Sequence, residues 1–128
     1  MTDFSFPKSQ RLTGEIRIAR LFTEGKAFIV YPLRVLYLPD EKLETANARI
    51  VISVPKKRRK RAVSRNLLKR RIREAYRLHK SPLFSLLDGK SYSLNIGINY
   101  VANDELPFKL IEAKMQEALA RIAEQLPA

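Results

Sequence analysis

One stretch of the chain combines basic side chains with an amide at helical spacing. It spans residues 62–80, "AVSRNLLKRRIREAYRLHK". At about 100° per residue, four cations lie within about 60° of Asn66: Lys69, Arg70, Arg73 and Arg77. The opposite side carries Leu68, Ile72, Ala75 and His79, with Tyr76 at its edge. Cations attract phosphates, and an amide hydrogen-bonds bases, sugars or phosphates, so this face predicts binding of a polyanion.

Groups that catalyse reactions are scarce in the sequence. His79 is the only histidine and there is no cysteine, which excludes a His-Cys pair, a multi-histidine metal site and disulfides. His79 falls on the apolar side of its helix, which favours a structural role. The pairs Asp40-Glu41 and Asp104-Glu105 fall at an expected turn and an expected helix start, where carboxylates act as caps. The sequence therefore predicts binding and not catalysis.

The charge of the chain is concentrated in one segment. The net charge is +12, and residues 56–77 contain 12 of the 25 basic residues but a single acidic one, Glu74. This segment therefore carries +11, and the remainder of the chain is nearly neutral. A solvated helix face usually mixes both signs, because opposite charges one turn apart stabilise a helix. A face with one sign of charge therefore favours an anionic partner.

Four other interpretations of the basic segment fit its sequence less well. A disordered tail has no reason to keep Leu68, Ile72 and Ala75 in register, and a nuclear address fits poorly because "KKRRKR" (56–61) continues directly into a helix. A membrane-surface helix needs its apolar side for lipid, whereas here a sheet is expected to cover that side. An ordinary solvated face is disfavoured by the single sign of charge. Nucleic acid is the favoured partner.

The remaining elements follow from periodicity and from the positions of glycine and proline. We predict a helix over residues 13–25 with Thr13 as N-cap and Gly25 as its stop, and two short strands or one bent edge strand around Pro32. A strand over 48–55 is expected to follow by a hairpin connection through "DEKLETAN". The stretch "SYSLNIGINY" (91–100) alternates as a strand with one buried face. A last helix starts near Asp104, with an apolar stripe that includes Met115.

This order of elements predicts an α+β fold, a small two-layer sandwich in the order αβββαβα with a mixed sheet. The length of 128 residues indicates a single domain over residues 1–128. No apolar stretch approaches the roughly 20 residues that span a bilayer, and residues 1–4 lack the pattern of a signal peptide. The expectation is a cytoplasmic protein with no membrane partner.

The segment "AVSRNLLKRRIREAYR" (62–77) resembles the signature helix of the bacterial ribonuclease P protein component. The family pattern is Ala-Val, any residue, Arg-Asn-Arg, any residue, Lys-Arg, two residues, Arg. The matching residues are Ala62, Val63, Arg65, Asn66, Lys69, Arg70 and Arg73. The resemblance extends upstream through "FPKSQRL", "RLFTEGKAF" and "ISVPKK", and covers roughly residues 4–80. Leu67 replaces the second arginine of Arg-Asn-Arg, and the loop after Lys57 is basic where the family has Ile-Gly-Asn.

The resemblance implies a function. The family's partner RNA cleaves the 5′ leader from precursor tRNA with Mg²⁺ held mainly by that RNA, and the protein binds the RNA and guides the leader. The family's protein has no small-molecule cofactor, and its fold contains a left-handed β-α-β crossover.

The residues that the resemblance leads us to expect in contact with RNA are Lys56, Lys57, Arg58, Arg61, Arg65, Asn66, Lys69, Arg70, Arg73 and Arg77. Those expected along the leader cleft are Ile18, Phe22 and Tyr37, although an aromatic at such a position is more often a core residue. A generic RNA-binding or ribosomal accessory protein is the alternative.

Overall fold

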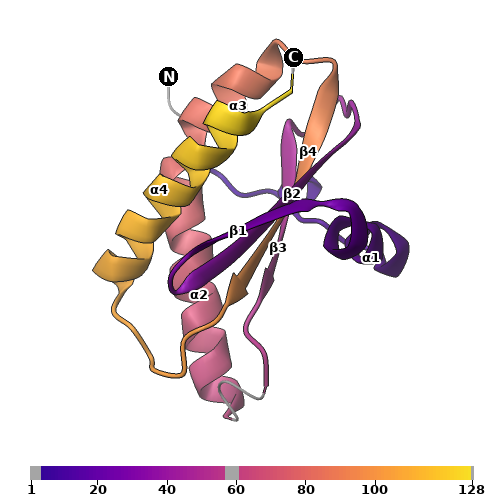
Figure 1. The fold of residues 1–128 in the computed structure, drawn as a ribbon. Helices are drawn as coiled ribbons and strands as arrows, with labels where there is room; N and C mark the ends of the chain where they lie inside the picture. Colours follow the sequence, from indigo (N-terminus) through magenta and orange to yellow (C-terminus); the bar gives the residue numbers. More distant parts are fainter. Residues whose placement is uncertain (1–3, 57–60, 128) are drawn as a thin grey trace.

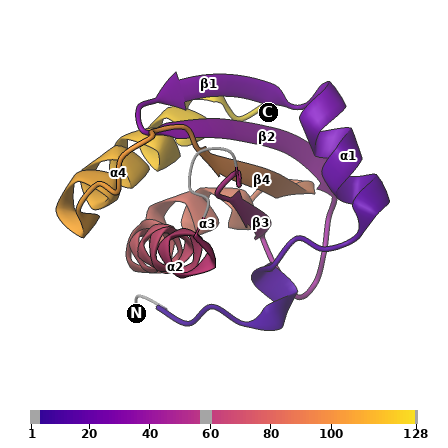
Figure 2. The same ribbon diagram turned by 90° about the horizontal axis from the view of Figure 1, so that it is seen from below.

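The computed structural model describes residues 4–56 and 61–127 of the chain. In chain order its elements are η1 (Lys8–Gln10), α1 (Glu15–Glu24), β1 (Lys26–Val30), β2 (Leu33–Glu41), β3 (Ala48–Ser53), α2 (Ala62–His79), α3 (Ser81–Asp88), β4 (Tyr92–Tyr100) and α4 (Phe108–Gln125). Figure 1 shows the long helices α2 and α4 beside the sheet, and Figure 2 shows α1 on its other side. The predicted α+β fold is confirmed.

The sheet has four strands in the order β1-β2-β4-β3. β1 and β2 form an antiparallel hairpin around Tyr31 and Pro32, so the first of the two interpretations of this region is correct. β4 is antiparallel to β2 and parallel to β3, which makes the sheet mixed as predicted. The hairpin predicted between β2 and β3 is wrong, because β4 lies between these two strands.

β3 and β4 are parallel neighbours, and α2 and α3 connect them. The chain therefore contains a β-α-β crossover at the place where the resemblance implies one. Its left-handed sense stays an expectation.

The main core lies between the sheet and the long helices. α2 contributes Leu68, Ile72, Ala75 and Tyr76, all with no exposed surface, so the predicted apolar side of this helix is confirmed. α4 contributes the predicted stripe through Ile111, Met115, Leu119 and Ile122, with Ala118 in addition. Because both helices bury one side against the sheet, their other sides are fixed toward solvent.

A second, smaller apolar cluster holds α1 on the opposite face of the sheet. It consists of Leu12, Leu21 and Leu36, with Ile18, Leu38 and Val51 packed against it. Gly97 makes this contact possible, because a Cβ atom there would lie 3.2 Å from the Leu21 side chain. As a result β4 is covered on both faces over most of its length, and the predicted single buried face is wrong: Ser93 and Asn95 are also buried.

Three boundaries differ from the sequence prediction. The N-cap of α1 is Gly14 (φ +95°) and not Thr13, and it provides no side-chain cap, whereas Gly25 ends the helix as predicted. Helix α3 was not predicted, although Pro82 in its first turn and Gly89 at its end are ordinary boundary signals. The last helix starts at Phe108 rather than near Asp104, because residues 101–107 pack as a loop in which the Tyr100 hydroxyl donates to the Asp104 carbonyl.

The N-terminal segment ties the end of α2 to the sheet. Lys80 is buried, and its ammonium group donates to the Ser5 carbonyl and to Gln10 Oε1. The same group lies 5.0 Å from the centre of the Phe84 ring. Further along, the Leu12 amide donates to the Ile50 carbonyl of β3 over 2.8 Å. The path of this segment therefore leads from α2 across the edge of the sheet into α1.

Candidate nucleic-acid interface

The outward side of α2 carries the predicted row of polar and basic residues. Asn66, Arg70 and Arg73 are exposed and Lys69 is partly exposed, while the residues on the opposite side of the helix are buried. Within residues 4–56 and 61–127 these four side chains form no hydrogen bond or ion pair. Their donors therefore point to solvent without an internal acceptor, which is the state expected of groups that bind a ligand.

Arg71 and Arg77 of α2 have internal partners. Arg71 donates to the Leu106 carbonyl over 2.7 Å and lies 4.0 Å from the Glu105 carboxylate. Arg77 holds Glu74 at 2.5 Å and donates to the Phe4 carbonyl over 2.9 Å. The Glu74 hydrogen bond raises the pKa of Arg77, and the Arg77 hydrogen bond lowers the pKa of Glu74. Arg77 was predicted as part of the row, but its guanidinium is already neutralised.

The basic segment before α2 is described only at its ends. Lys56 and Arg61 are exposed, and Arg61 occupies the N-cap position of α2. Arg65, in the first turns of the helix, is partly exposed. Lys57 and Arg58, also predicted to contact RNA, lie outside the described residues.

Two apolar side chains lie beside the basic row at the start of α2. Leu67, the departure from the family pattern, is partly exposed and so lies at the edge of the row. Val63 is 81% exposed, one turn before Asn66 and on the same side of the helix. An exposed β-branched residue in this place was not singled out from the sequence, although it belongs to the matched pattern.

The three residues predicted for the leader cleft do not lie together. Phe22 is 38% exposed on α1, and Ile18, one turn earlier, packs at the margin of the small cluster. Tyr37 is buried in the main core on the other face of the sheet, where its hydroxyl donates to Gln125 Oε1 over 2.7 Å. Side chains alternate along β2, so Leu36 and Leu38 face α1 while Tyr37 faces α4. Tyr37 is therefore a core residue, which is the alternative that the sequence favoured for an aromatic at such a position.

A row of partly exposed side chains crosses the α1 face of the sheet. The strand registers place Ile29, Arg34, Asn99 and Ser53 side by side on β1, β2, β4 and β3. Ile29 is 60% exposed, and the other three are partly exposed. Ser53 precedes Lys56 by three residues, so the row leads toward the basic segment. The pairing that aligns Asn99 with Arg34 and Ser53 joins strands from distant parts of the chain, so it was not predictable from the local sequence.

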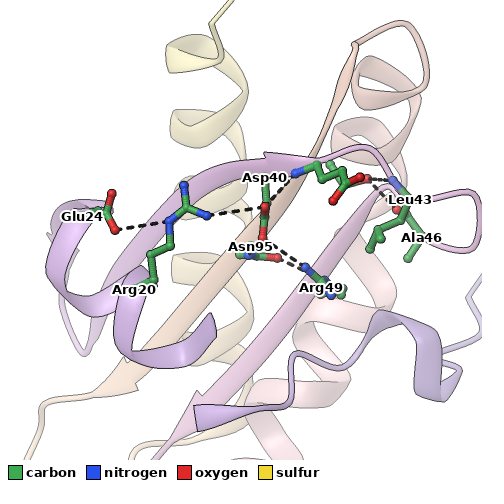
Figure 3. A network of polar contacts seen from close by, with 9 residues as sticks. Arg20, Glu24, Asp40, Leu43, Ala46, Arg49 and Asn95 are labelled. Carbon is green, nitrogen blue, oxygen red and sulfur yellow. Dashed lines mark hydrogen bonds and ion pairs between the residues drawn. The ribbon is translucent and has the colours of Figure 1, made fainter. Parts of the chain in front are cut away.

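Next to α1 the same face carries a network of charged and amide groups (Figure 3). Asp40 Oδ2 accepts from Asn95 Nδ2 at 2.9 Å and from Arg49 Nη2 at 3.4 Å, and Arg49 Nε donates to Asn95 Oδ1 at 3.1 Å. Arg20 of α1 approaches Asp40 Oδ1 at 3.8 Å and Glu24 at 3.2 Å.

The network shifts the protonation of its acidic member. Burial raises the pKa of Asp40, but hydrogen bonds from the Glu41 amide and Asn95, together with the Arg20 and Arg49 charges, outweigh it and lower the pKa. Burial and the nearby Arg17 charge lower the pKa of Arg49, which Asp40 partly offsets. Asp40 is therefore held as a carboxylate at neutral pH.

The described residues 4–56 and 61–127 do not form a metal site or a membrane span. There is no group of three or more His, Cys, Asp or Glu able to hold a metal ion. His79 Nε2 lies 2.8 Å from the Glu112 carboxylate, which links α2 to α4 and gives the histidine the structural partner that was expected. No helix in these ranges is long and apolar enough to cross a membrane.

Comparison with known proteins shows the family to which the chain belongs. The family model described as Ribonuclease P matches residues 6–123. The ribonuclease P protein component of Porphyromonas gingivalis is 44% identical over 126 residues, covering 98% of this chain and 91% of that protein. The ribonuclease P protein of Thermotoga maritima has a TM-score of 0.66 at 25% identity, covering 88% of this chain and 96% of the other. The Staphylococcus aureus protein shares the fold, with a TM-score of 0.66 at 23% identity over 91% and 97% of the two chains. The chain therefore belongs to the ribonuclease P protein component family.

Proposed function

We propose that this chain is the non-catalytic protein subunit of ribonuclease P, which binds the catalytic RNA with the outward side of α2. The observation that carries the proposal is the contrast along that helix. Asn66, Lys69, Arg70 and Arg73 have no partner among the described residues, whereas Leu68, Ile72 and Ala75 are buried. Burial of one side fixes the direction of the other, so the cations are presented as a rigid row that releases counterions from the RNA when it binds.

The second part of the proposal concerns the substrate. The 5′ leader of precursor tRNA lies across the α1 face of the sheet, between Phe22 and the row formed by Arg34, Asn99 and Ser53. Arg34 supplies a charge for a phosphate, and Asn99 and Ser53 supply hydrogen-bonding groups. Phe22 offers a partly exposed ring on which a base stacks, an interaction worth about 1–3 kcal/mol. Tyr37 is left out of this surface because it is buried.

In this proposal the protein contributes charge and position, and the RNA carries out the cleavage. Mg²⁺ is assigned to the RNA, in line with the family resemblance. The protein's cations neutralise phosphates that otherwise need Mg²⁺, so the protein is most useful when Mg²⁺ is scarce. We further propose a single RNA-binding domain that acts in the cytoplasm, where its proposed partners are found.

Reconstituted cleavage tests the proposal. The cognate catalytic RNA is assayed on precursor tRNA at low and high Mg²⁺, with and without the protein. The expected result is a large increase in cleavage at low Mg²⁺ that shrinks as Mg²⁺ rises. The absence of any increase with the cognate RNA would contradict the proposal. A generic RNA-binding protein would bind precursor and mature tRNA complexes equally, so the affinity ratio between the two separates the alternatives.

A further inference from the structure

The two sides of α1 have different surroundings. Ile18 and Phe22 are one turn apart and share one side of the helix, while Arg20 and Glu24 share the other. The side with Arg20 lies against the network around Asp40 (Figure 3). Only Leu21 of this helix is fully buried. The apolar anchorage of α1 is therefore narrow, and a second restraint is needed to fix how the helix is rotated about its axis.

The ion pair between Arg20 and Asp40 is the one charged link from α1 to the sheet among the described residues. The Arg20 side chain is 51% exposed and Asp40 is 19% exposed. Glu24 holds the same guanidinium from within the helix at 3.2 Å. Arg20 thus extends from its helix in a defined direction and meets an acceptor on β2.

Asp40 is a rigid acceptor because three strands hold it. Its own strand supplies the Glu41 amide at 2.7 Å, β4 supplies Asn95 and β3 supplies Arg49. Asn95 is 1% exposed, and Arg49 also bonds its amide oxygen, so neither partner is free to turn away. A carboxylate in this setting is too buried and too well paired to be a primary contact for RNA. Its Oδ1 atom, which accepts from the Glu41 amide, is thereby also fixed in place opposite Arg20.

We propose that Asp40 is a positioning residue for single-stranded RNA: through Arg20 it holds α1 so that Ile18 and Phe22 face the Arg34–Asn99–Ser53 row. The inference rests on the proposed function, since the leader of precursor tRNA is the strand that this surface takes. Mature tRNA lacks the leader, so loss of the restraint lowers affinity for the precursor complex only. Binding of the catalytic RNA through α2 is independent of it.

A pair of variants with opposite charge changes tests this role. Asp40→Asn and Arg20→Gln both remove the ion pair, but the first removes a negative charge and the second removes a positive one. Both are expected to lower the ratio of precursor to mature tRNA affinity by about threefold to tenfold, because each loosens α1. Affinity for the catalytic RNA alone and cleavage at saturating substrate stay within about twofold of the unmodified protein.

Two matched controls separate position from charge. Glu24→Gln makes the same charge change as Asp40→Asn, at another residue that contacts Arg20, but it leaves the link to the sheet intact. Its ratio of precursor to mature tRNA affinity is therefore expected to stay within about twofold of the unmodified protein. Arg20→Lys keeps a cation opposite Asp40 and is expected to restore most of the ratio lost in Arg20→Gln. In the double variant of Asp40→Asn and Arg20→Gln, the affinity ratio is expected to fall no further than in either single variant, because both substitutions remove the same ion pair.

The outcomes distinguish the inference from the function on which it rests. A purely electrostatic role predicts that Asp40→Asn raises the ratio and Arg20→Gln lowers it, and this result would overturn the inference. Two variants that both match the unmodified protein would also overturn it. A protein that shows no preference for precursor over mature tRNA removes the proposed function and the inference together. Should Asp40→Asn unfold in a thermal melt, Arg20→Gln, at a half-exposed position, decides the matter alone.

Discussion

The Arg77 guanidinium lies against the Glu74 carboxylate one turn earlier on α2, with 2.5 Å between Nη2 and Oε1 and 3.0 Å between Nε and Oε2. Glu74 is the single acidic residue of the basic segment. It is paired with the last cation of the row and not with Arg70 or Arg73. The positive row available to RNA therefore ends one turn earlier than the sequence predicts.

The pairing of Arg77 predicts unequal effects of two arginine substitutions on RNA binding. Arg73→Ala removes a cation with no internal partner, so the slope of log affinity against log salt is expected to decrease by about 0.7 if one phosphate contact is lost. Arg77→Ala is expected to change the slope clearly less. Binding to the catalytic RNA is measured over a series of salt concentrations.

Lys114→Ala, on α4, provides the control for loss of one charge outside α2. It should leave the slope unchanged. Equal slopes for the Arg73 and Arg77 variants would show that RNA displaces Glu74 from Arg77.

The different placement of two aromatic residues predicts different defects when each is changed. Phe22→Ala removes the exposed ring from the α1 face and is expected to weaken the precursor complex, by up to about 1–3 kcal/mol, but not the mature tRNA complex. Tyr37→Phe removes only the part-buried hydrogen bond to Gln125 at the end of α4, at a cost of about 1 kcal/mol in the free energy of unfolding. Its affinity for both RNA complexes should be unchanged. A precursor-specific defect in Tyr37→Phe would place this residue in the leader path after all.

The α2 row was predictable because all of its information is local. One helical period relates Leu68, Ile72 and Ala75 to Asn66 and Arg73, so the direction of every side chain follows once the apolar side is known. The same reasoning placed Met115 in the core of α4. The bonds from Arg71 to Leu106 and from Arg77 to Phe4 were not predictable, because these acceptors come from distant segments. The pair of Arg77 with Glu74, in contrast, joins two residues one turn apart on the same helix.

The face of the sheet against α1 was less predictable because it depends on strand pairing. Alternation shows that Leu36 and Tyr37 point in opposite directions, but it does not show which face receives α1. The insertion of β4 between β2 and β3 brings Asp40, Asn95 and Arg49 together, although they are spread over 56 positions of the sequence. A hairpin between β2 and β3 was the simpler expectation, and it excludes this network.

The departure at Leu67 predicts a gain in RNA binding when it is reversed. Leu67→Arg adds a cation at the edge of the row, where the family pattern has arginine and where the side chain is already partly exposed. We expect tighter binding to the catalytic RNA and a salt slope steeper by up to about 0.7. Leu67→Gln is the control, since it removes the apolar side chain without adding charge. Identical salt slopes for the two variants would place position 67 away from the phosphates.

The hydrogen bonds around Asp40 predict a dependence of stability on acidic pH. The folded-state pKa of Asp40 lies below its unfolded value, which is about 3.9. Its contribution to stability is therefore complete above the unfolded value and is lost as the pH falls through the lower, folded-state value. Asp40→Asn is expected to cost about 1–2 kcal/mol in the free energy of unfolding at neutral pH, from the weakened charged hydrogen bonds.

Denaturant unfolding at several pH values measures this contribution. The difference between the unmodified protein and Asp40→Asn should be constant from neutral pH down to about pH 5, and should shrink below about pH 4. Glu124→Gln, at an exposed position of α4, is the control and should give a small difference. A difference for Asp40→Asn that stays constant into strong acid would mean that the carboxylate is not stabilised by Arg49, Asn95 and Arg20, and that the restraint on α1 has another origin.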